Sequence, residues 1–311
     1  MRDSFPFTRR AWLAAVGATG YGISAASRTL ADNDDLLIID CHAHIYGEDE
    51  KKYPTIESPY RPPEGKGTVP HLKQEMRAAG VRLVTAIQTS TFYRWDNRFT
   101  ADTARNNPES MVAVVTLNPD DPASPEKLRK YVAQSNVRGM RSIPARSGKL
   151  DDPGVDKLWT TAEDLGIVIN VLVNRDKRPE LEKLLLRHPR LRVVMDHCLG
   201  LAAGPTLEPT LADMLALAAY PNTHAKLTFI PTGSAQPFPC RDMHDACRAI
   251  IGAYGPGRCV WGSDFPCELW CPKVSYRQHL QIFTHELGLD RATQKSVLGE
   301  TARRLWFQPR A

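Results

Sequence analysis

Apolar runs alternate with amphipathic stretches along most of the chain, from residue 36 to residue 307. Eight of the runs are short and rich in β-branched or other apolar residues, as strands buried on both faces of a sheet usually are. The eight predicted strands cover residues 36–44, 82–90, 111–119, 137–144, 166–173, 191–198, 223–230 and 258–266. The stretches between them, such as "PHLKQEMRAAG" and "RPELEKLLLRHP", predict helices.

This regular alternation predicts the fold class. From Asp40 to Asp264 the seven strand-to-strand steps average about 32 residues, an ordinary length for a strand–helix unit. Eight such units predict an α/β fold, a (β/α)8 TIM barrel that forms one domain over residues 32–311. A doubly wound open sheet is the alternative, but we find no Gly-rich phosphate loop after an early strand.

The first 31 residues depart from the pattern. "TRRAWLAAVGATGYG" places Thr8, Arg9 and Arg10 before an apolar stretch that contains glycines. This order resembles a twin-arginine export signal, so we expect residues 1–31 to be a cleavable signal peptide. The mature protein is then expected to be periplasmic or otherwise exported through the twin-arginine route. The stretch is short for a membrane span, and no stable span is expected after cleavage. The alternative is an N-terminal tail that is unstructured or anchors the protein to a membrane.

Charge and cysteine content change this picture little. The formal net charge is +5, and the first 31 residues, with four arginines and one aspartate, supply three of these charges. No basic stripe is interleaved with aromatic residues, so a nucleic-acid partner is not expected.

A chain of 311 residues does not need a disulfide framework, and most of the seven cysteines are expected to be free buried thiols. Cys267 and Cys271 flank "ELW" and are the one candidate pair; the sequence indicates no oligomeric state.

The candidate chemistry lies where the predicted strands end, because barrel active sites form at the C-terminal strand ends. The first strand ends in "DCHAH". Strand alternation would point Asp40, His42 and His44 into the barrel and Cys41 and Ala43 toward the helices. The other strand ends contribute Arg138 and Arg141 (strand four), Asp196 and His197 (strand six), Lys226 (strand seven) and Asp264 (strand eight). Alternation allows only one of Asp196 and His197 to face inward.

These residue types indicate a metal-assisted or acid–base hydrolytic site. His42, His44, His197 and Asp264 would converge at the barrel mouth, and imidazole with carboxylate suits one divalent ion, zinc or a similar metal. Such an ion polarises a carbonyl and lowers the pKa of bound water, whose proton Asp264 would accept as general base.

The segments "DCHAHI", "VMDHCLG" and "VWGSDFP" resemble the amidohydrolase-related family of the amidohydrolase superfamily, over residues 36–307. More narrowly, the chain is similar to the branch of sugar-acid lactonases and 2-pyrone-4,6-dicarboxylate lactonase-like hydrolases. The resemblance implies a distorted (β/α)8 barrel and hydrolysis of an activated carbonyl, most often in a lactone.

The resemblance also implies roles for single residues. His42, His44, His197 and Asp264 match the family's metal-site positions, with His197 and Asp264 also catalytic. Arg141 matches an arginine that binds a substrate carboxylate, which implies an anionic small-molecule substrate. Lys226 matches a lysine often found on strand seven; it either contacts substrate or is a buried ion-pair partner.

One departure and several alternatives stay open. The end of the fifth strand, "INVLVNRD", lacks the His, Glu or Cys that many metal-dependent relatives carry, so a metal-free mechanism with the same residues is the alternative. A metal-dependent decarboxylase of an unsaturated acid, or a non-catalytic binding barrel, are the alternative functions. Asp40 is expected to be structural, and Tyr93 or Trp95 in the loop after strand two either lines the pocket or packs within the loop.

Overall fold

Short β-branched segments form the eight strands of a barrel in the computed structural model, which describes residues 36–308. The strands are β1 (Ile39–Ala43), β2 (Leu83–Ile87), β3 (Met111–Thr116), β4 (Val137–Ser142), β5 (Val168–Val171), β6 (Val193–Met195), β7 (Thr223–Lys226) and β8 (Cys259–Val260). All neighbours pair in parallel and in chain order. Every strand lies within the range predicted for it, so the predicted barrel is confirmed.

The barrel closes between β8 and β1, although the pairing there is short. Cys41 N donates to Trp261 O at 3.1 Å, and His44 N donates to Phe265 O at 2.8 Å. Gly262 allows this approach, because a Cβ at that position would come within 2.7 Å of His42 Cβ. The last strand therefore delivers the segment after it directly beside the histidines of β1.

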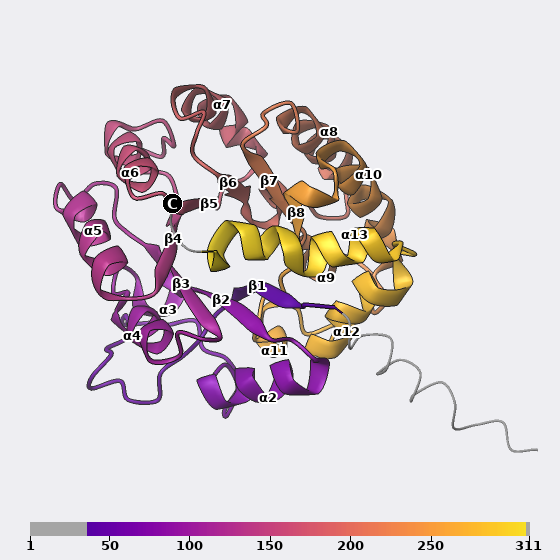
Figure 1. The fold of residues 1–311 in the computed structure, drawn as a ribbon, viewed down its shortest axis with the longest axis horizontal. Helices are drawn as coiled ribbons and strands as arrows, with labels where there is room; N and C mark the ends of the chain where they lie inside the picture. The colour runs from indigo at the N-terminus through magenta and orange to yellow at the C-terminus, as the bar shows by residue number, and fades with distance from the viewer. Residues whose placement is uncertain (1–35, 309–311) are drawn as a thin grey trace, which may run out of the picture. The chain divides into compact units, whose positions relative to one another are not determined.

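Helices cover the outside of the barrel (Figure 1). The longer ones are α2 (Val69–Ala79), α4 (Arg98–Asn106), α5 (Ser124–Gln134), α6 (Pro153–Asp164), α7 (Arg178–Arg187), α8 (Leu207–Leu217), α10 (His244–Tyr254) and α12 (Tyr276–Gln281). Short helices are α3 (Ser90–Tyr93), α9 (Phe229–Gly233), α11 (Cys267–Trp270) and α13 (Arg291–Lys295). Within residues 36–308 no helix is long and apolar enough to cross a membrane.

Local sequence signals set several helix ends. Thr68 begins α2 by accepting a hydrogen bond from His71 N, and Gly80 ends it in the left-handed conformation. Asp152 accepts from Gly154 N at the start of α6. Ser275 and Gln278 form a reciprocal capping box that starts α12, which lies against the β1–β8 closure.

Side chains fill the interior of the barrel. The C-terminal helical segment closes the end at which the strands begin. Leu305 and Trp306, in segment η7 (Arg303–Phe307), pack with interior strand residues that include Ile39 and Val168. Figure 1 shows this yellow segment crossing one end of the barrel. Because these strand residues lie near the strand starts, the closed end is opposite the site.

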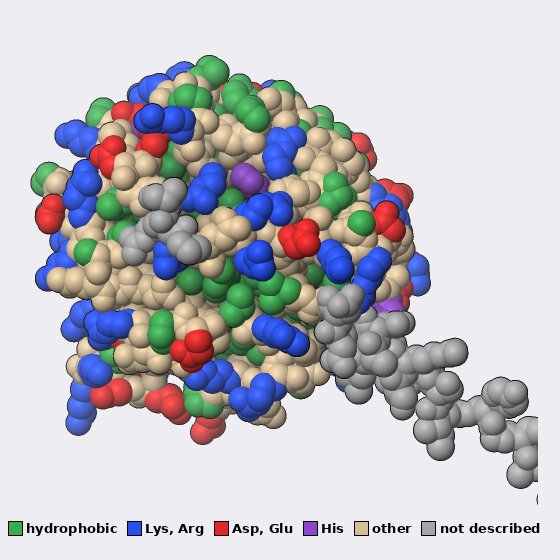
Figure 2. All heavy atoms as spheres, in the orientation of Figure 1, with side chains coloured by type: hydrophobic (Ala, Val, Ile, Leu, Met, Phe, Trp, Pro, Cys, Tyr) green, Lys and Arg blue, Asp and Glu red, His purple; other side chains and the backbone are tan. Residues whose placement is uncertain are grey.

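On the face drawn in Figure 2, Lys and Arg side chains are dispersed among acidic and apolar ones and form no single stripe.

The first strand does not alternate as predicted. Pairing with β2 is irregular between Asp40 and Ala43, and Cys41 packs in the barrel interior with Ile39. Asp40 instead accepts hydrogen bonds from Ser263 and from Tyr276 of α12, on the helix side. The prediction that Asp40 points inward and Cys41 outward was wrong because a local irregularity shifts the strand's facing; the structural role of Asp40 is confirmed.

Some predictions fall outside the described part of the chain. The export signal at residues 1–31, its cleavage and the start of the domain at residue 32 lie before the first described residue; the described residues belong to a unit that begins at Leu36.

Candidate active site

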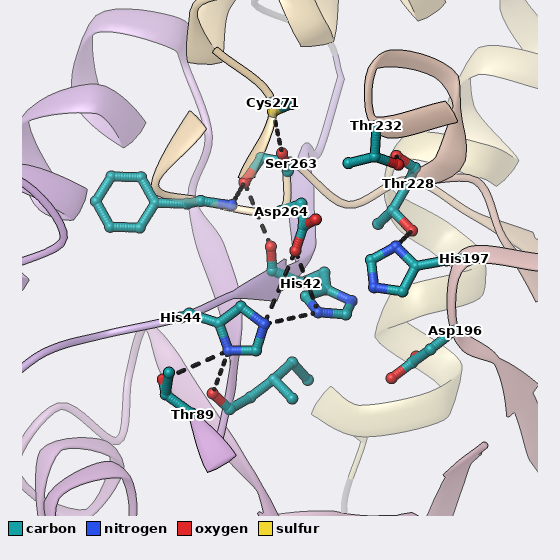
Figure 3. Close-up of polar contacts among 12 residues, drawn as sticks. His42, His44, Thr89, Asp196, His197, Thr228, Thr232, Ser263, Asp264 and Cys271 are labelled. Atoms are coloured by element: carbon teal, nitrogen blue, oxygen red, sulfur yellow. Dashed lines mark hydrogen bonds and ion pairs between the residues drawn. The ribbon is translucent and has the colours of Figure 1, made fainter. Parts of the chain in front are cut away.

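Three side chains converge at the C-terminal ends of β1 and β8. The Nε2 atoms of His42 and His44 lie 3.2 Å apart. Asp264 Oδ1 lies 3.5 Å from His42 Nε2 and 3.8 Å from His44 Nε2. All three residues are buried, and Figure 3 shows them facing one another across a small space. These three residues lie together, as predicted from the ends of the first and last strands.

The other hydrogen bonds of the two rings indicate which nitrogen atoms carry protons. His44 Nδ1 lies 3.0 Å from the carbonyl oxygen of Ile87, which can only accept, so Nδ1 donates and Nε2 has a free lone pair. His42 Nε2 lies 2.8 Å from Arg141 Nη2, which can only donate, so this nitrogen accepts. Burial lowers the pKa of both histidines well below the usual value, which keeps the rings neutral.

These protonation states test whether a cation fits. Two imidazole lone pairs and a carboxylate oxygen face one another, and these ligand atoms all lie within 4.8 Å of one another. Acceptors packed together in this way repel unless a proton or a cation lies among them. The donor set of two histidines and one aspartate suits a divalent ion such as zinc, so the residues present fit the predicted metal. Burial raises the pKa of Asp264 to about 7, so a shared proton is the other way to relieve the repulsion.

Left-handed backbone conformations place His197 and Asp264. His197, Cys198 and Leu199 have φ of 54°, 48° and 61°, and Asp264 has φ of 55°. Residues other than glycine seldom adopt this conformation, and such outliers concentrate at functional sites. The turn at His197 breaks the alternation of β6, so Asp196 and His197 both reach the interior. The prediction that only one of them faces inward was therefore wrong.

His197 lies beside the His42–His44–Asp264 group without belonging to it. Its ring centroid is 4.7 Å from that of His42. Its Nδ1 lies 2.8 Å from Thr228 Oγ1, just beyond β7 (Figure 3). Burial lowers the pKa of His197 to about 4, so the ring is neutral. Three of the four predicted ligands thus form the close group, and His197 lies on the adjoining pocket wall. Its role as a fourth ligand stays a prediction.

Asp196 is the centre of a buried ionic network. Its carboxylate is 3.0 Å from Arg141 Nε and 2.8 Å from Lys226 Nζ, and Asn170 Nδ2 donates to it at 3.0 Å. Burial alone would raise the pKa of Asp196, but Lys226 and Arg141 outweigh burial and hold the pKa below its usual range. Lys226 is fully buried, 5.4 Å from the Trp306 ring centroid, which supports its interpretation as an ion-pair partner and not as a substrate contact.

Asp40 accepts hydrogen bonds that hold the segment before Asp264 in place. Ser263 N and Oγ donate to its carboxylate at 2.9 and 2.6 Å, and Tyr276 OH donates at 3.0 Å. Ser263 immediately precedes Asp264, so this anchor fixes the segment that carries the Asp264 carboxylate. Burial raises the pKa of Asp40 even though these donors oppose the shift.

A pocket of about 290 Å³ opens beside Asp264 and His197. Asn174, Thr232 and Trp270 supply its other polar and aromatic walls. The Trp270 ring also lies against that of His44, with centroids 5.5 Å apart and the planes tilted by 48°. Trp270 and Thr228 were missed by the sequence analysis; the signals were the aromatic residue in "CELWC" and a hydroxyl two positions after Lys226.

Other predicted candidates lie elsewhere. Tyr93 packs with Tyr46 and Phe92, and its hydroxyl accepts from Gly47 N, so the packed-loop interpretation holds for it. Trp95 lines a different pocket, beside α4 and α5. Cys267 and Cys271 are free buried thiols in the structure.

The parallel eight-stranded barrel, with buried imidazoles and a carboxylate at its C-terminal mouth, agrees with the amidohydrolase-type barrel expected from the sequence. The model of the amidohydrolase family matches residues 39–308. The chain belongs to this family.

Relatives agree with this assignment. The L-fucono-1,5-lactonase of Burkholderia ambifaria is 28% identical over 243 residues, which cover 73% of this chain and 80% of the relative. A Pseudomonas putida protein described as a 2-pyrone-4,6-dicarboxylic acid hydrolase has a TM-score of 0.75 at 23% identity, over 88% of this chain and 98% of its own. A zinc-bound amidohydrolase of Burkholderia multivorans has a TM-score of 0.70 at 22% identity, over 88% and 100%. At these identities the two structures demonstrate the shared fold.

Proposed function

We propose that this protein hydrolyses the lactone of a sugar acid. The observation that carries the proposal is the buried Asp264 carboxylate, held beside His42 and His44 at the edge of a pocket. The sequence relation to an L-fucono-1,5-lactonase supports the same bond type.

The residues of the site have different roles in this proposal. Asp264, in its ionised form, accepts a proton from the attacking water and later gives it to the leaving ring oxygen. His197, fixed by Thr228, faces the pocket and can hydrogen-bond the substrate. A divalent ion, zinc being the candidate, would be held by His42, His44 and Asp264 and would supply polarisation of the carbonyl.

The pocket favours an uncharged lactone over the anionic substrate predicted from Arg141. The residues described as lining the pocket include no Lys or Arg. Arg141 has 4% of its surface exposed and is already bonded to Asp196 and His42. Asn174 and Thr232 offer neutral hydrogen-bonding groups, and the Trp270 ring offers an apolar face, which together suit a polyhydroxylated ring.

A lactone panel tests the proposal. Sugar 1,5-lactones, 2-pyrone-4,6-dicarboxylate and a simple aryl ester would be followed by acid release, with and without chelator. We expect turnover of uncharged sugar lactones and its loss in Asp264→Asn. Release of CO2 from an unsaturated acid, with no lactone turnover, would instead establish a decarboxylase. Saturable binding of a lactone without turnover would establish a non-catalytic barrel.

We also propose export by the twin-arginine route, which would make the protein periplasmic. The support is the segment around Thr8, Arg9 and Arg10 followed by an apolar stretch.

A further inference from the structure

The guanidinium of Arg141 joins two parts of the site. Its Nε donates to Asp196 Oδ2 at 3.0 Å, and its Nη2 donates to His42 Nε2 at 2.8 Å. Asp196 is in turn fixed by Lys226 and Asn170, so Arg141 is held firmly from behind. The planar fork of arginine suits this bridging role, which the point charge of a lysine does not reproduce.

The hydrogen bond from Arg141 and a metal ion would both require the same atom of His42, Nε2. A neutral imidazole has one lone pair, and in His42 it lies on Nε2, because that nitrogen accepts from Arg141. The same Nε2 faces His44 and Asp264 in the candidate metal group. The other ring nitrogen, Nδ1, is buried and has no hydrogen-bond partner among the described residues. One lone pair cannot serve both a guanidinium and a cation.

We propose that Arg141 and a divalent cation are alternative occupants of His42, so that Arg141 holds metal affinity below what His42, His44 and Asp264 would otherwise give. Metal binding breaks the Arg141–His42 hydrogen bond and turns the freed Nη2 away from the imidazole. Arg141 is therefore a residue that sets metal dependence, in addition to neutralising Asp196.

Cobalt(II) is the probe, because its visible absorption reports coordination without any substrate. Chelator-treated protein would be titrated with Co²⁺ by absorption and by calorimetry in the parent, Arg141→Met and Arg141→Lys. Losing a charge-assisted hydrogen bond that competes with the ion should tighten Co²⁺ binding by about 10–100-fold. Arg141→Lys keeps the positive charge near Asp196 but loses the fork, so we expect it to tighten binding as well.

Two controls separate competition from electrostatics. Lys226→Met removes one positive charge from the same Asp196 without touching His42, and measures the effect of charge alone. Arg138→Met changes the other arginine of β4 and should leave Co²⁺ affinity at the parent value. Affinity in Arg141→Lys within about twofold of the parent, or Arg141→Met no tighter than Lys226→Met, would overturn the proposal.

A crystal structure of the unmodified protein soaked in Zn²⁺ gives a second test that does not depend on variants folding. We expect zinc on His42, His44 and Asp264, with Arg141 Nη2 beyond hydrogen-bond distance of His42 Nε2. Zinc bound to His42 while the Arg141–His42 hydrogen bond persists would refute the competition. Neither test uses a substrate, so the outcome is independent of the lactonase proposal.

Discussion

The Nδ1 atom of His197 and the Oγ1 atom of Thr228 lie 2.8 Å apart, joining the turn after β6 to the segment after β7. The contact fixes the orientation of the His197 ring, which otherwise depends on a strained left-handed backbone.

Removing this hydroxyl should reduce turnover and leave the fold intact. Thr228→Val keeps the shape of the side chain, and the lost hydrogen bond of about 0.5–1.5 kcal/mol corresponds to a kcat about 2–10-fold lower. Thr228→Ser restores the hydroxyl and should recover most of kcat. Steady-state kinetics on a lactone, with circular dichroism on the same samples, make the comparison. Equal losses in the Val and Ser variants would show that packing, and not the hydrogen bond, matters here.

Asp264→Asn keeps the shape of the carboxylate but cannot accept a proton from water. General acid–base groups contribute ~10²–10⁴-fold, so kcat should fall by that range in a folded protein. Metal content must be measured on the same sample, because Asp264 belongs to the candidate metal group. A folded variant with kcat within about threefold of the parent would exclude Asp264 as the base.

Trp270 should contribute to substrate binding more than to chemistry. Its ring lines the pocket and lies tilted against the His44 ring. Trp270→Ala should raise KM by about 2–10-fold, the range expected for loss of one aromatic contact, with a smaller change in kcat. Trp270→Phe keeps an aromatic face and should lie close to the parent. A fall confined to kcat would instead assign Trp270 to positioning His44.

His279 should make the protein sensitive to acid. It is fully buried in α12, accepts a hydrogen bond from Trp261 Nε1 at 2.8 Å, and burial lowers its pKa to about 3. The unfolded chain binds a proton near pH 6.5 and the folded protein does not, so stability is present above that pH and falls as pH drops toward 3. One such group gives a slope of about 1.4 kcal/mol per pH unit.

His279→Asn keeps an acceptor for Trp261 and removes the titrating ring. Urea unfolding at several pH values between 6.5 and 4.5 should show a slope shallower by about one proton than in the parent. His285→Asn, at an exposed position in the next helical segment, is the matched control. An unchanged slope in His279→Asn would show that other buried groups account for the acid sensitivity.

The export proposal is tested by charge-conserving changes to the arginine pair. Changing Arg9 and Arg10 together to lysine should leave the protein in the cytoplasm, since the signal depends on arginine and not on charge alone. Cell fractionation and immunoblotting provide the measurement, with Arg2→Lys as the control. Undiminished periplasmic protein in the double variant would remove the hypothesis.

The fold could be predicted because its strands are coded locally. "MVAVVTLNP" and "GIVINVLV" are apolar at nearly every position, as strands buried on both faces must be, and β3 and β5 lie inside them. The convergence of His42 with Asp264 followed from the same reasoning, since both end strands that meet where the barrel closes.

The errors came from backbone geometry and from long-range pairing. Strand alternation predicted that Cys41 faces the helices, but the irregular pairing of β1 turns it into the barrel. Alternation also predicted that only one of Asp196 and His197 faces the interior, but the left-handed turn after β6 lets both reach it. No local pattern indicated that Arg141 bonds His42, because 99 positions separate the two residues.

Segment η7 makes the floor beneath the ionic network. Trp306, 1% exposed, lies under Lys226 and closes the end of the barrel opposite the pocket. Water kept out at this point would otherwise screen the charges that hold Asp196, Arg141 and thus His42 in place. Truncating the chain into segment η7, or fusing a bulky partner there, should therefore change the reactivity of the site from the opposite end of the barrel. Neither change touches a residue that contacts the substrate.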